Sequence, residues 1–210
     1  MTARIRKNRK EIPTASRRPG DRLLRLLACI RVQAWARTAV ALVRIAASLQ
    51  AGADAAPVGE YQLKAVFLFN FAKFVEWPPQ AFADAHDPFT ICVLGDNPFG
   101  SSLDDAVRGK TVANRPIVIH LISSPQQART CQILFVSASK HKRMRGILEA
   151  LKICCLLTVG DTDDFTTNGG IVQFKVNDAR VRIEIDAEAA GLANLRISSK
   201  LLSLAEPARH

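Results

Sequence analysis

The sequence predicts a single α/β domain over residues 57–210, a layered sandwich with a mostly parallel or mixed sheet flanked by helices. Three observations lead to this prediction. Short runs of β-branched and other apolar residues recur along the chain, segments of helical or turn character separate them, and the last two runs are close enough to form a hairpin. Strands separated by helices are typical of parallel sheets, and the hairpin adds an antiparallel edge.

The first predicted element is a helix of four to five turns that begins at Glu60 and ends at Trp77, before Pro78. Its apolar arc, interrupted only by Lys64, is about 200° wide, whereas a surface helix needs little more than about 100°. We therefore expect this helix to contact more than one apolar surface. Phe69 falls on the otherwise polar side. Either the helix simply packs between the sheet and a second helix, or Phe69 belongs to a dimer or partner surface.

The remaining elements follow in order along the chain. The predicted strands are 89–94, 116–122, 133–136 and 154–159, followed by a hairpin of 170–176 and 181–185. The predicted helices are 101–107, a short polar one at 125–129, an amphipathic one at 139–151, and a closing one that contains 201–205.

The net charge of +10 comes almost entirely from the first quarter of the chain. Residues 1–56 contain 12 Lys and Arg against 3 Asp and Glu, whereas residues 57–210 contain 17 against 16. A domain so close to neutral argues against nucleic acid as a partner. The basic start, the apolar runs and the small residues near Ala53–Ala55 predict a signal peptide that is cleaved there and directs the domain to the periplasm. A disordered basic arm and an organellar transit peptide are the alternatives.

Export places four cysteines in an oxidising compartment. Four cysteines can form two bonds in three ways, and they are Cys92, Cys131, Cys154 and Cys155. A bond between the neighbours Cys154 and Cys155 is disfavoured because it strains the backbone. Four buried reduced thiols are the alternative. The cysteines and histidines lack the spacing of a zinc site, and we predict neither a metal nor a cofactor.

The sequence lacks a nucleophile elbow, a phosphate loop and a dinucleotide fingerprint, so it predicts no enzyme. The best argument for one comes from Asp96 and Asp161, which follow predicted strands at the ends where open α/β sheets bind ligands. Arg196 precedes the last helix, and its guanidinium could hold a carboxylate or phosphate. Glu184 and Arg182 are two positions apart in one predicted strand, so their side chains point to the same face, and both are predicted to face outward. Ordinary turn residues and solvated side chains are the simpler interpretation.

Several segments, in order, resemble the YfiR-like family of periplasmic regulators (YfiR/HmsC-like). They are 64–78 (KAVFLFNFAKFVEWP), 89–100 (FTICVLGDNPFG), 131–137 (CQILFVS), 157–161 (LTVGD), 169–170 (GG) and 195–202 (LRISSKLL). The resemblance implies a small exported α/β protein that is often dimeric. The best-known members restrain a membrane-bound diguanylate cyclase by binding its periplasmic sensor region, which lowers cyclic-di-GMP output and biofilm formation.

The resemblance also carries expectations for individual residues. Cys92 and Cys131 fall on family cysteine positions, which implies a disulfide between them. The second disulfide of the family's type member maps near Thr166 and Gln173, so we expect that bridge to be absent.

Two functional hypotheses follow. The first is a non-catalytic periplasmic regulator, a homodimer that binds a membrane-bound diguanylate cyclase or another inner-membrane sensor, with Phe69 and Glu184 as candidate contacts. The second is an exported small-molecule-binding protein or hydrolase that uses the cleft at the strand ends, with Asp96, Asp161 and Arg196 as candidate ligand-binding residues.

Overall fold

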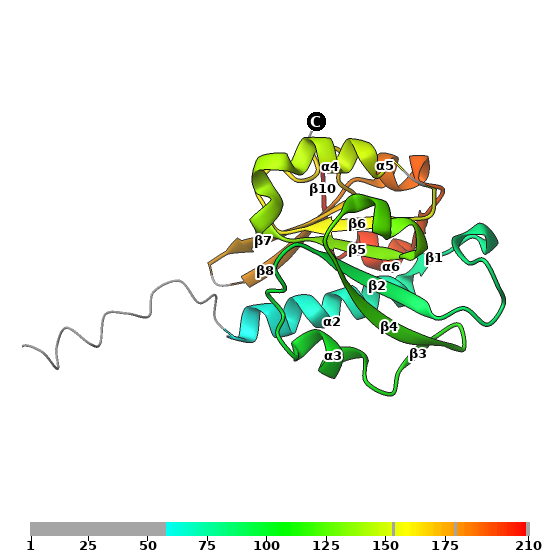
Figure 1. The fold of residues 1–210 in the computed structure, drawn as a ribbon. Coiled ribbons are helices and arrows are strands. Elements are labelled where there is room, and N and C mark those ends of the chain that lie inside the picture. The colour runs from blue at the N-terminus through cyan, green and yellow to red at the C-terminus, as the bar shows by residue number, and fades with distance from the viewer. Residues whose placement is uncertain (1–57, 153, 179, 209–210) are drawn as a thin grey trace, which may run out of the picture. The chain divides into compact units, whose positions relative to one another are not determined.

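The computed structural model describes residues 58–208 apart from 153 and 179, and the predicted leader lies outside the described residues. The strands of this part of the chain are β1 Val75–Glu76, β2 Phe89–Leu94, β3 Thr111–Val112, β4 Arg115–Ile122, β5 Ile133–Val136, β6 Leu157–Gly160, β7 Val172–Asn177, β8 Arg180–Ile185, β9 Arg196–Ile197 and β10 Glu206–Pro207. Eight of them form one sheet in the order β10-β8-β7-β6-β5-β2-β4-β3, and β1 pairs with β9 separately (Figure 1).

The centre of the sheet is parallel. β4, β2, β5, β6 and β7 are parallel neighbours, whereas β8 joins β7 and β3 joins β4 in antiparallel pairs. Numbered along the chain, the five parallel strands stand in the order 2-1-3-4-5, so the direction in which the chain crosses the sheet reverses between β2 and β5. The predicted α/β class, with a mostly parallel sheet and an antiparallel edge, is confirmed.

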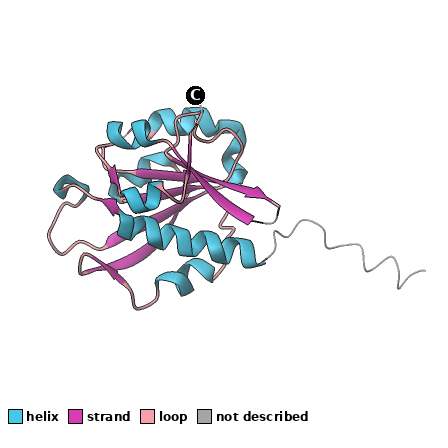
Figure 2. Cartoon of the chain, turned by 180° about the vertical axis from the view of Figure 1, so that it is seen from behind, coloured by secondary structure: helices cyan, strands magenta, loops and turns pink. Residues whose placement is uncertain are grey.

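Helices cover both faces of the sheet. The α-helices are α2 Val58–Phe74, α3 Ser102–Val107, α4 Met144–Ala150, α5 Ala187–Leu192 and α6 Ser199–Leu202, and the 3-10 helices are η1 Pro79–Ala81, η2 Pro125–Thr130 and η3 Ala138–Arg143. α2 and α3 lie on one face and α4 lies on the other, as Figures 1 and 2 show from opposite sides. None of the helices in the described ranges has the length and apolar character that crossing a membrane requires.

α2 contacts several elements, as its wide apolar arc predicts. Its inner side packs on the sheet, where the ring of Phe71 stacks on that of Phe174 with centroids 5.8 Å apart, and its flanks contact α3 and α6. Leu63, at one edge of the arc, nevertheless keeps 43% of its surface exposed, and Val66, which lies outside the arc, keeps 45%. α2 therefore combines a buried face with an exposed apolar edge.

The opposite face of the sheet is covered by α4 and by the loop that follows β6. Met144, Ile147 and Leu148 of α4 pack in one apolar cluster with Phe165 of that loop. The helix predicted over 139–151 is α-helical only from Met144, because the preceding polar segment forms the 3-10 helix η3 and contributes no buried residue.

Other boundaries differ from the prediction for identifiable reasons. The strand predicted over 154–159 begins at Leu157, because Cys154 and Cys155 lie in a turn in which Cys155 has a φ of 70°. α5 and the two-residue strands were not predicted, since segments so short show no measurable hydrophobic period.

Two glycines are required by the ring of Phe165, which is fully buried. A Cβ atom would lie 2.3 Å from Cδ2 of this ring at Gly160 and 2.1 Å from Cε1 at Gly170. We expect Gly160→Ala and Gly170→Ala each to lower the free energy of unfolding by about 1–3 kcal/mol, because the ring must move. Urea unfolding followed by circular dichroism measures this loss.

Gly191 in α5 provides the matched control, since a Cβ there would meet no atom within 4 Å. Gly191→Ala should leave stability unchanged or raise it by up to about 1 kcal/mol, because alanine favours the helix. Equal stability of the wild type, Gly160→Ala and Gly170→Ala would show that Phe165 does not need this space.

Candidate functional site

The carboxyl ends of the parallel strands carry both acidic residues that the sequence predicts there. Asp96 follows β2 and Asp161 follows β6. Asp96 is exposed, and its backbone N–H donates to the Oγ atom of Ser139, which joins the loop after β2 to the loop after β5. Asp161 has a different environment, because α2 passes over it.

A buried ionic cluster joins α2 to the end of β6. The side chain of Lys64 is only 2% exposed, and its Nζ atom lies 2.6 Å from Oε1 of Glu60 and 2.9 Å from Oδ2 of Asp161. The hydroxyl of Tyr61 donates to the same Oδ2 atom at 2.8 Å. The single lysine within the apolar arc of α2 is thus neutralised by two carboxylates, one from its own helix and one from a residue 97 positions away.

The second carboxylate oxygen of Asp161 has no hydrogen-bond partner among the described residues, although it is buried. The cluster forms one wall of a cavity of about 340 Å³ that is also lined by Asp163, Phe174 and Lys175. A buried carboxylate oxygen without a donor is costly, so the arrangement favours a hydrogen-bond donor at this position.

The same environment acts on Tyr61, the only tyrosine in the sequence. Burial raises the pKa of the Tyr61 hydroxyl well above its ordinary value, and the charge of Asp161 and the hydrogen bond to it raise the pKa further. The protonated phenol is therefore favoured in the folded state. Its contribution to stability is fully present below the unfolded pKa of about 10 and is lost as the pH rises through the higher folded pKa.

We expect tyrosinate absorbance to appear in the folded protein only above the pH range of ordinary tyrosine, and to return to that range in urea. Asp161→Asn should lower the pKa of Tyr61 without making it ordinary, because the charge is removed while burial remains. A spectrophotometric pH titration measures both effects. A folded protein that titrates like free tyrosine would contradict the described environment of Tyr61.

Arg196 does not join this cluster. It lies on β9, in register with Glu76 of β1, just beyond the last turn of α2, whereas Lys64 and Asp161 lie near the first turns. About 15 Å of helix separates Lys64 from Phe74. The grouping of Asp96, Asp161 and Arg196 in one cleft is therefore wrong, because the sequence could not show that Arg196 belongs to a strand at the opposite end of α2.

Phe69 is half-buried against the main core on the α2 face. The Nζ atom of Lys110 lies 4.3 Å from the centroid of its ring, and that of Lys73 lies 5.5 Å away. Phe69 also continues a row at i, i+3 spacing that begins with the exposed Leu63 and Val66. We call these three residues the α2 ridge.

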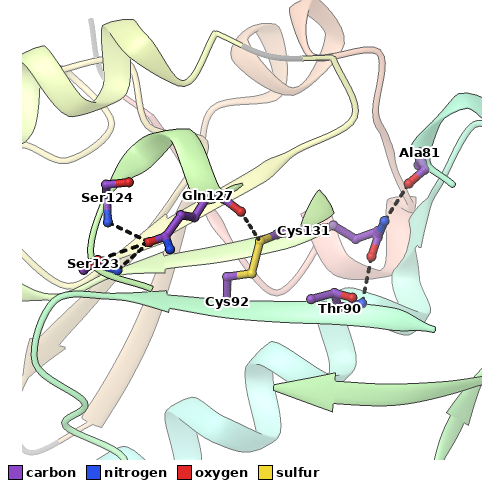
Figure 3. The surroundings of a disulfide bond; sticks show 8 residues. Ala81, Thr90, Cys92, Ser123, Ser124, Gln127 and Cys131 are labelled. Carbon is purple, nitrogen blue, oxygen red and sulfur yellow. Dashed lines mark hydrogen bonds between the residues drawn. A yellow bond between two sulfur atoms is a disulfide. The ribbon is translucent and has the colours of Figure 1, made fainter. Parts of the chain in front are cut away.

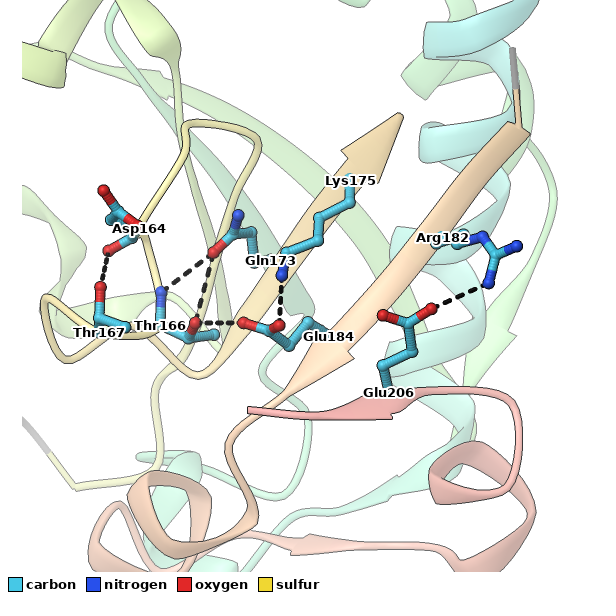
Figure 4. A network of polar contacts seen from close by, with 8 residues as sticks. All are labelled: Asp164, Thr166, Thr167, Gln173, Lys175, Arg182, Glu184 and Glu206. Carbon is cyan, nitrogen blue, oxygen red and sulfur yellow. Dashed lines mark hydrogen bonds and ion pairs between the residues drawn. The ribbon is translucent and has the colours of Figure 1, made fainter. Parts of the chain in front are cut away.

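Glu184 is buried, so the expectation that it faces outward is wrong. Its side chain is 7% exposed, its Oε1 atom accepts a hydrogen bond of 2.5 Å from Thr166 Oγ1, and its Oε2 atom pairs with Lys175 (Figure 4). Arg182, on the same face of β8, is exposed and pairs with Glu206 at 2.9 Å. The alternation of side chains along β8 therefore places both residues on one face, but the loop after β6 covers only Glu184.

A disulfide joins Cys92 of β2 to Cys131, which precedes β5, with Cα atoms 5.9 Å apart (Figure 3). Both cysteines are buried. Gln127 accepts hydrogen bonds from the backbone N–H groups of Ser123 and Ser124, which fixes η2 beside the bond. The pair implied by the resemblance is thus present in the structure, tied to a central strand.

The structure also joins Cys154 to Cys155, and the expectation that these neighbours would not bond is wrong. Cys155 has a left-handed backbone, with a φ of 70°. At the position of the family's second disulfide, the backbone N–H of Thr166 donates to Oε1 of Gln173 at 3.3 Å. A hydrogen bond links these two positions in this chain.

The cluster of Lys64, Tyr61 and Asp161 suits binding better than acid–base chemistry. Lys64 is held between two carboxylates, and the tyrosine hydroxyl is kept protonated. In the described part of the chain, no three His, Cys, Asp or Glu side chains are grouped so that they could hold a metal ion.

Two solved structures show limited likeness to the chain. A conserved domain protein from Vibrio cholerae O1 biovar El Tor has 11% sequence identity and a TM-score of 0.43, over 57% of this chain and 54% of that chain. An ABC domain from Streptococcus pneumoniae in complex with L-Trp has 9% identity and a TM-score of 0.48, over 68% of this chain and 59% of that chain. The chain thus spans less than two thirds of either structure, and we base no argument on them.

Sequence comparison identifies the family. No curated protein matches the chain. The sequence model of one family matches residues 61–206, a range that contains the buried ionic cluster, the Cys92–Cys131 bond and the whole sheet apart from Pro207. The match covers more than half of the chain and agrees with the resemblance seen in the sequence. This protein belongs to the YfiR/HmsC-like family.

Proposed function

We propose that this chain is a non-catalytic periplasmic regulatory protein that binds the periplasmic sensor region of a membrane-bound diguanylate cyclase and represses it. The observation that carries the proposal is the family match over residues 61–206. A repressor of this kind would lower cyclic-di-GMP output and, with it, biofilm formation.

The disulfide between Cys92 and Cys131 supports a location outside the cytoplasm. Structural disulfides form and persist in oxidising compartments such as the periplasm and are rare in the cytosol. The bond is buried beside the central strand of the sheet, which fits a structural role.

Repression requires no chemistry by the chain itself. A protein that binds the inactive arrangement of a sensor more tightly than the active one shifts the population toward the inactive state. The shift cannot exceed the difference between the two binding free energies.

The α2 ridge is the surface that we assign to this contact. Leu63 and Val66 are the exposed apolar residues of α2, and Phe69 extends their row. Apolar side chains that are contiguous on one surface are typical of protein interaction sites, whereas isolated ones are common on any surface. Glu184 is not assigned to the contact, because the loop after β6 covers it.

The test combines genetics with capture. Deleting the gene should raise cyclic-di-GMP and biofilm, and cross-linking of the tagged chain in cells should capture an inner-membrane cyclase. Complementation with Leu63→Asp/Val66→Asp should fail although the variant folds. Leu192→Asp is the matched control, since Leu192 is an exposed leucine (84%) on another helix, α5, and its loss should not matter.

Two results would refute the proposal. One is an unchanged cyclic-di-GMP level on deletion together with no captured membrane cyclase or other sensor. The other is absence of the chain from periplasmic fractions. Full repression by Leu63→Asp/Val66→Asp would refute only the assignment of the α2 ridge.

A second candidate function rests on the unpartnered oxygen of Asp161 at the cavity beside Lys64. An exported small-molecule-binding protein could use this oxygen to accept a hydrogen bond from a ligand. A thermal-shift screen of small amines and polyols tests this function. Asp161→Asn should abolish any shift, whereas Asp96→Asn, at the exposed strand end, should leave it unchanged. Equal shifts in all three proteins would exclude this cavity.

A further inference from the structure

A different cavity lies at the strand ends on the α4 face, and neither the cyclase contact nor the Asp161 cavity of the proposed functions includes it. Its volume is about 470 Å³, within the range of small-molecule sites. Leu94 at the end of β2 and Ile147 of α4 provide apolar surface. Ser123, Gln126, Lys140 and Arg143 provide the polar groups, from the loop after β4, η2 and η3.

The charge of this cavity is entirely positive. Lys140 and Arg143 line it, and none of its lining residues is acidic. The cavity beside Lys64, by contrast, is lined by three carboxylates. A domain with almost no net charge therefore has a cavity with two cations and two uncharged hydrogen-bonding side chains.

These cations lie in the most basic segment of the domain. Residues 138–148 contain four Lys and Arg and no Asp or Glu. Among the ion pairs formed between described residues, none involves Lys140, Lys142, Arg143 or Arg145. Their positive charge is therefore available to an anion from outside the chain.

The position of the cavity in the sheet agrees with its charge. The strand order reverses between β2 and β5, and open α/β sheets bind ligands in the crevice outside the carboxyl ends of the strands at such a reversal. Gly95 allows the loops to meet there, since a Cβ atom on it would lie 2.6 Å from Ser139 Oγ and 3.1 Å from Lys140 Cε. Gly95 has a φ of +100°, which L side chains rarely adopt.

We propose that this cavity binds a phosphate group, carried either by a free small molecule or by a lipid head group. Lys140 and Arg143 would neutralise the charge of the phosphate, which is one unit in a lipid diester and up to two in a monoester, with the side-chain amide of Gln126 donating a hydrogen bond to its oxygens. The hydroxyl of Ser123 donates to Oε1 of Gln127 at 3.2 Å. The apolar surface of Leu94 and Ile147 would contact the rest of the molecule. This site does not depend on the cyclase partner proposed above.

The test compares two double variants that remove equal charge from one segment. Lys140→Gln/Arg143→Gln removes the two cations that line the cavity, and Lys142→Gln/Arg145→Gln removes two exposed ones that do not. The free-ligand probes are inorganic phosphate and glycerol 3-phosphate, titrated by calorimetry at low ionic strength. The lipid probe is co-sedimentation with phosphatidylcholine vesicles that contain or lack phosphatidylglycerol.

We expect saturable binding of one class of probe, weakened at least about tenfold by Lys140→Gln/Arg143→Gln and little changed by Lys142→Gln/Arg145→Gln. Saturation with glycerol 3-phosphate identifies a free ligand, whereas binding to phosphatidylglycerol vesicles alone identifies a head group. Thermal melts confirm that both variants fold. Equal weakening by the two variants would show only diffuse surface charge and would overturn the proposal, as would the absence of binding to every probe.

Discussion

Replacing Lys64 with methionine is expected to destabilise the domain by about 3–5 kcal/mol. Methionine keeps the length and apolar stem of the side chain but leaves Asp161 buried and charged without its cation. The side chain of Asp161 is only 5% exposed and one of its oxygens already lacks a partner, so the loss of the cation leaves a buried carboxylate poorly compensated. Guanidinium unfolding followed by circular dichroism measures the loss.

The physical cause can be separated from the loss of packing. Lys64→Met/Asp161→Asn should be more stable than Lys64→Met alone, because the uncompensated charge is also removed. Arg108→Met is the control, since the pair of Arg108 and Asp105, at 2.6 Å, is as short as that of Lys64 and Glu60 but exposed, and its loss should cost less than about 1 kcal/mol. Similar losses in Lys64→Met and Arg108→Met would show that burial does not strengthen the Lys64 cluster.

Removing the disulfide between Cys92 and Cys131 should cost about 4 kcal/mol. The bond joins positions 39 apart, and in the chain-entropy model a loop of that length stabilises a protein by roughly this amount. Cys92→Ala/Cys131→Ala should therefore unfold at clearly lower denaturant concentration. A regulator whose sensor contact needs a rigid sheet would lose repression together with this stability.

The second cysteine pair supplies the control. Cys154 and Cys155 are adjacent, so their bond closes no loop, and Cys154→Ser/Cys155→Ser should leave stability nearly unchanged. Cys154 is exposed whereas Cys155, Cys92 and Cys131 are buried, so mild reductant followed by alkylation should label one thiol in the folded protein and four only after unfolding. Mass analysis that finds all four thiols free without reductant would contradict both bonds.

The parts of the fold that the sequence predicts are those with a local signal. The strands 89–94 and 133–136 have the predicted boundaries, because a nearly continuous run of apolar residues, interrupted only by Thr90, is expected where both faces of a strand are buried. The hairpin of β7 and β8 was predicted from two such runs around a turn, and it forms. The strand order depends on contacts between distant segments, which no local pattern encodes.

The candidate site shows the same division. Lys64 was visible as the one charge in the apolar arc of α2, but its partner Asp161 is 97 residues away and could be identified only in the fold. Alternation along β8 placed Glu184 and Arg182 on one face correctly, yet it could not show that a distant loop covers one of them. Sequence pattern thus gives the direction of a side chain, whereas burial depends on the neighbours that the fold supplies.

The two borders of the sheet limit how copies of this protein can associate. β10 and β3, each two residues long, are its outermost strands, and Pro207 in β10 has no N–H to offer. Next to β10, the uncovered part of β8 carries the exposed Arg180 and Arg182. Short, charged or proline-containing borders resist the addition of foreign strands. Strand addition is therefore disfavoured at the β10 border. At the other border β3 pairs only with Arg115 and Pro116, so the rest of β4, up to Ile122, is where a strand of a second copy could add.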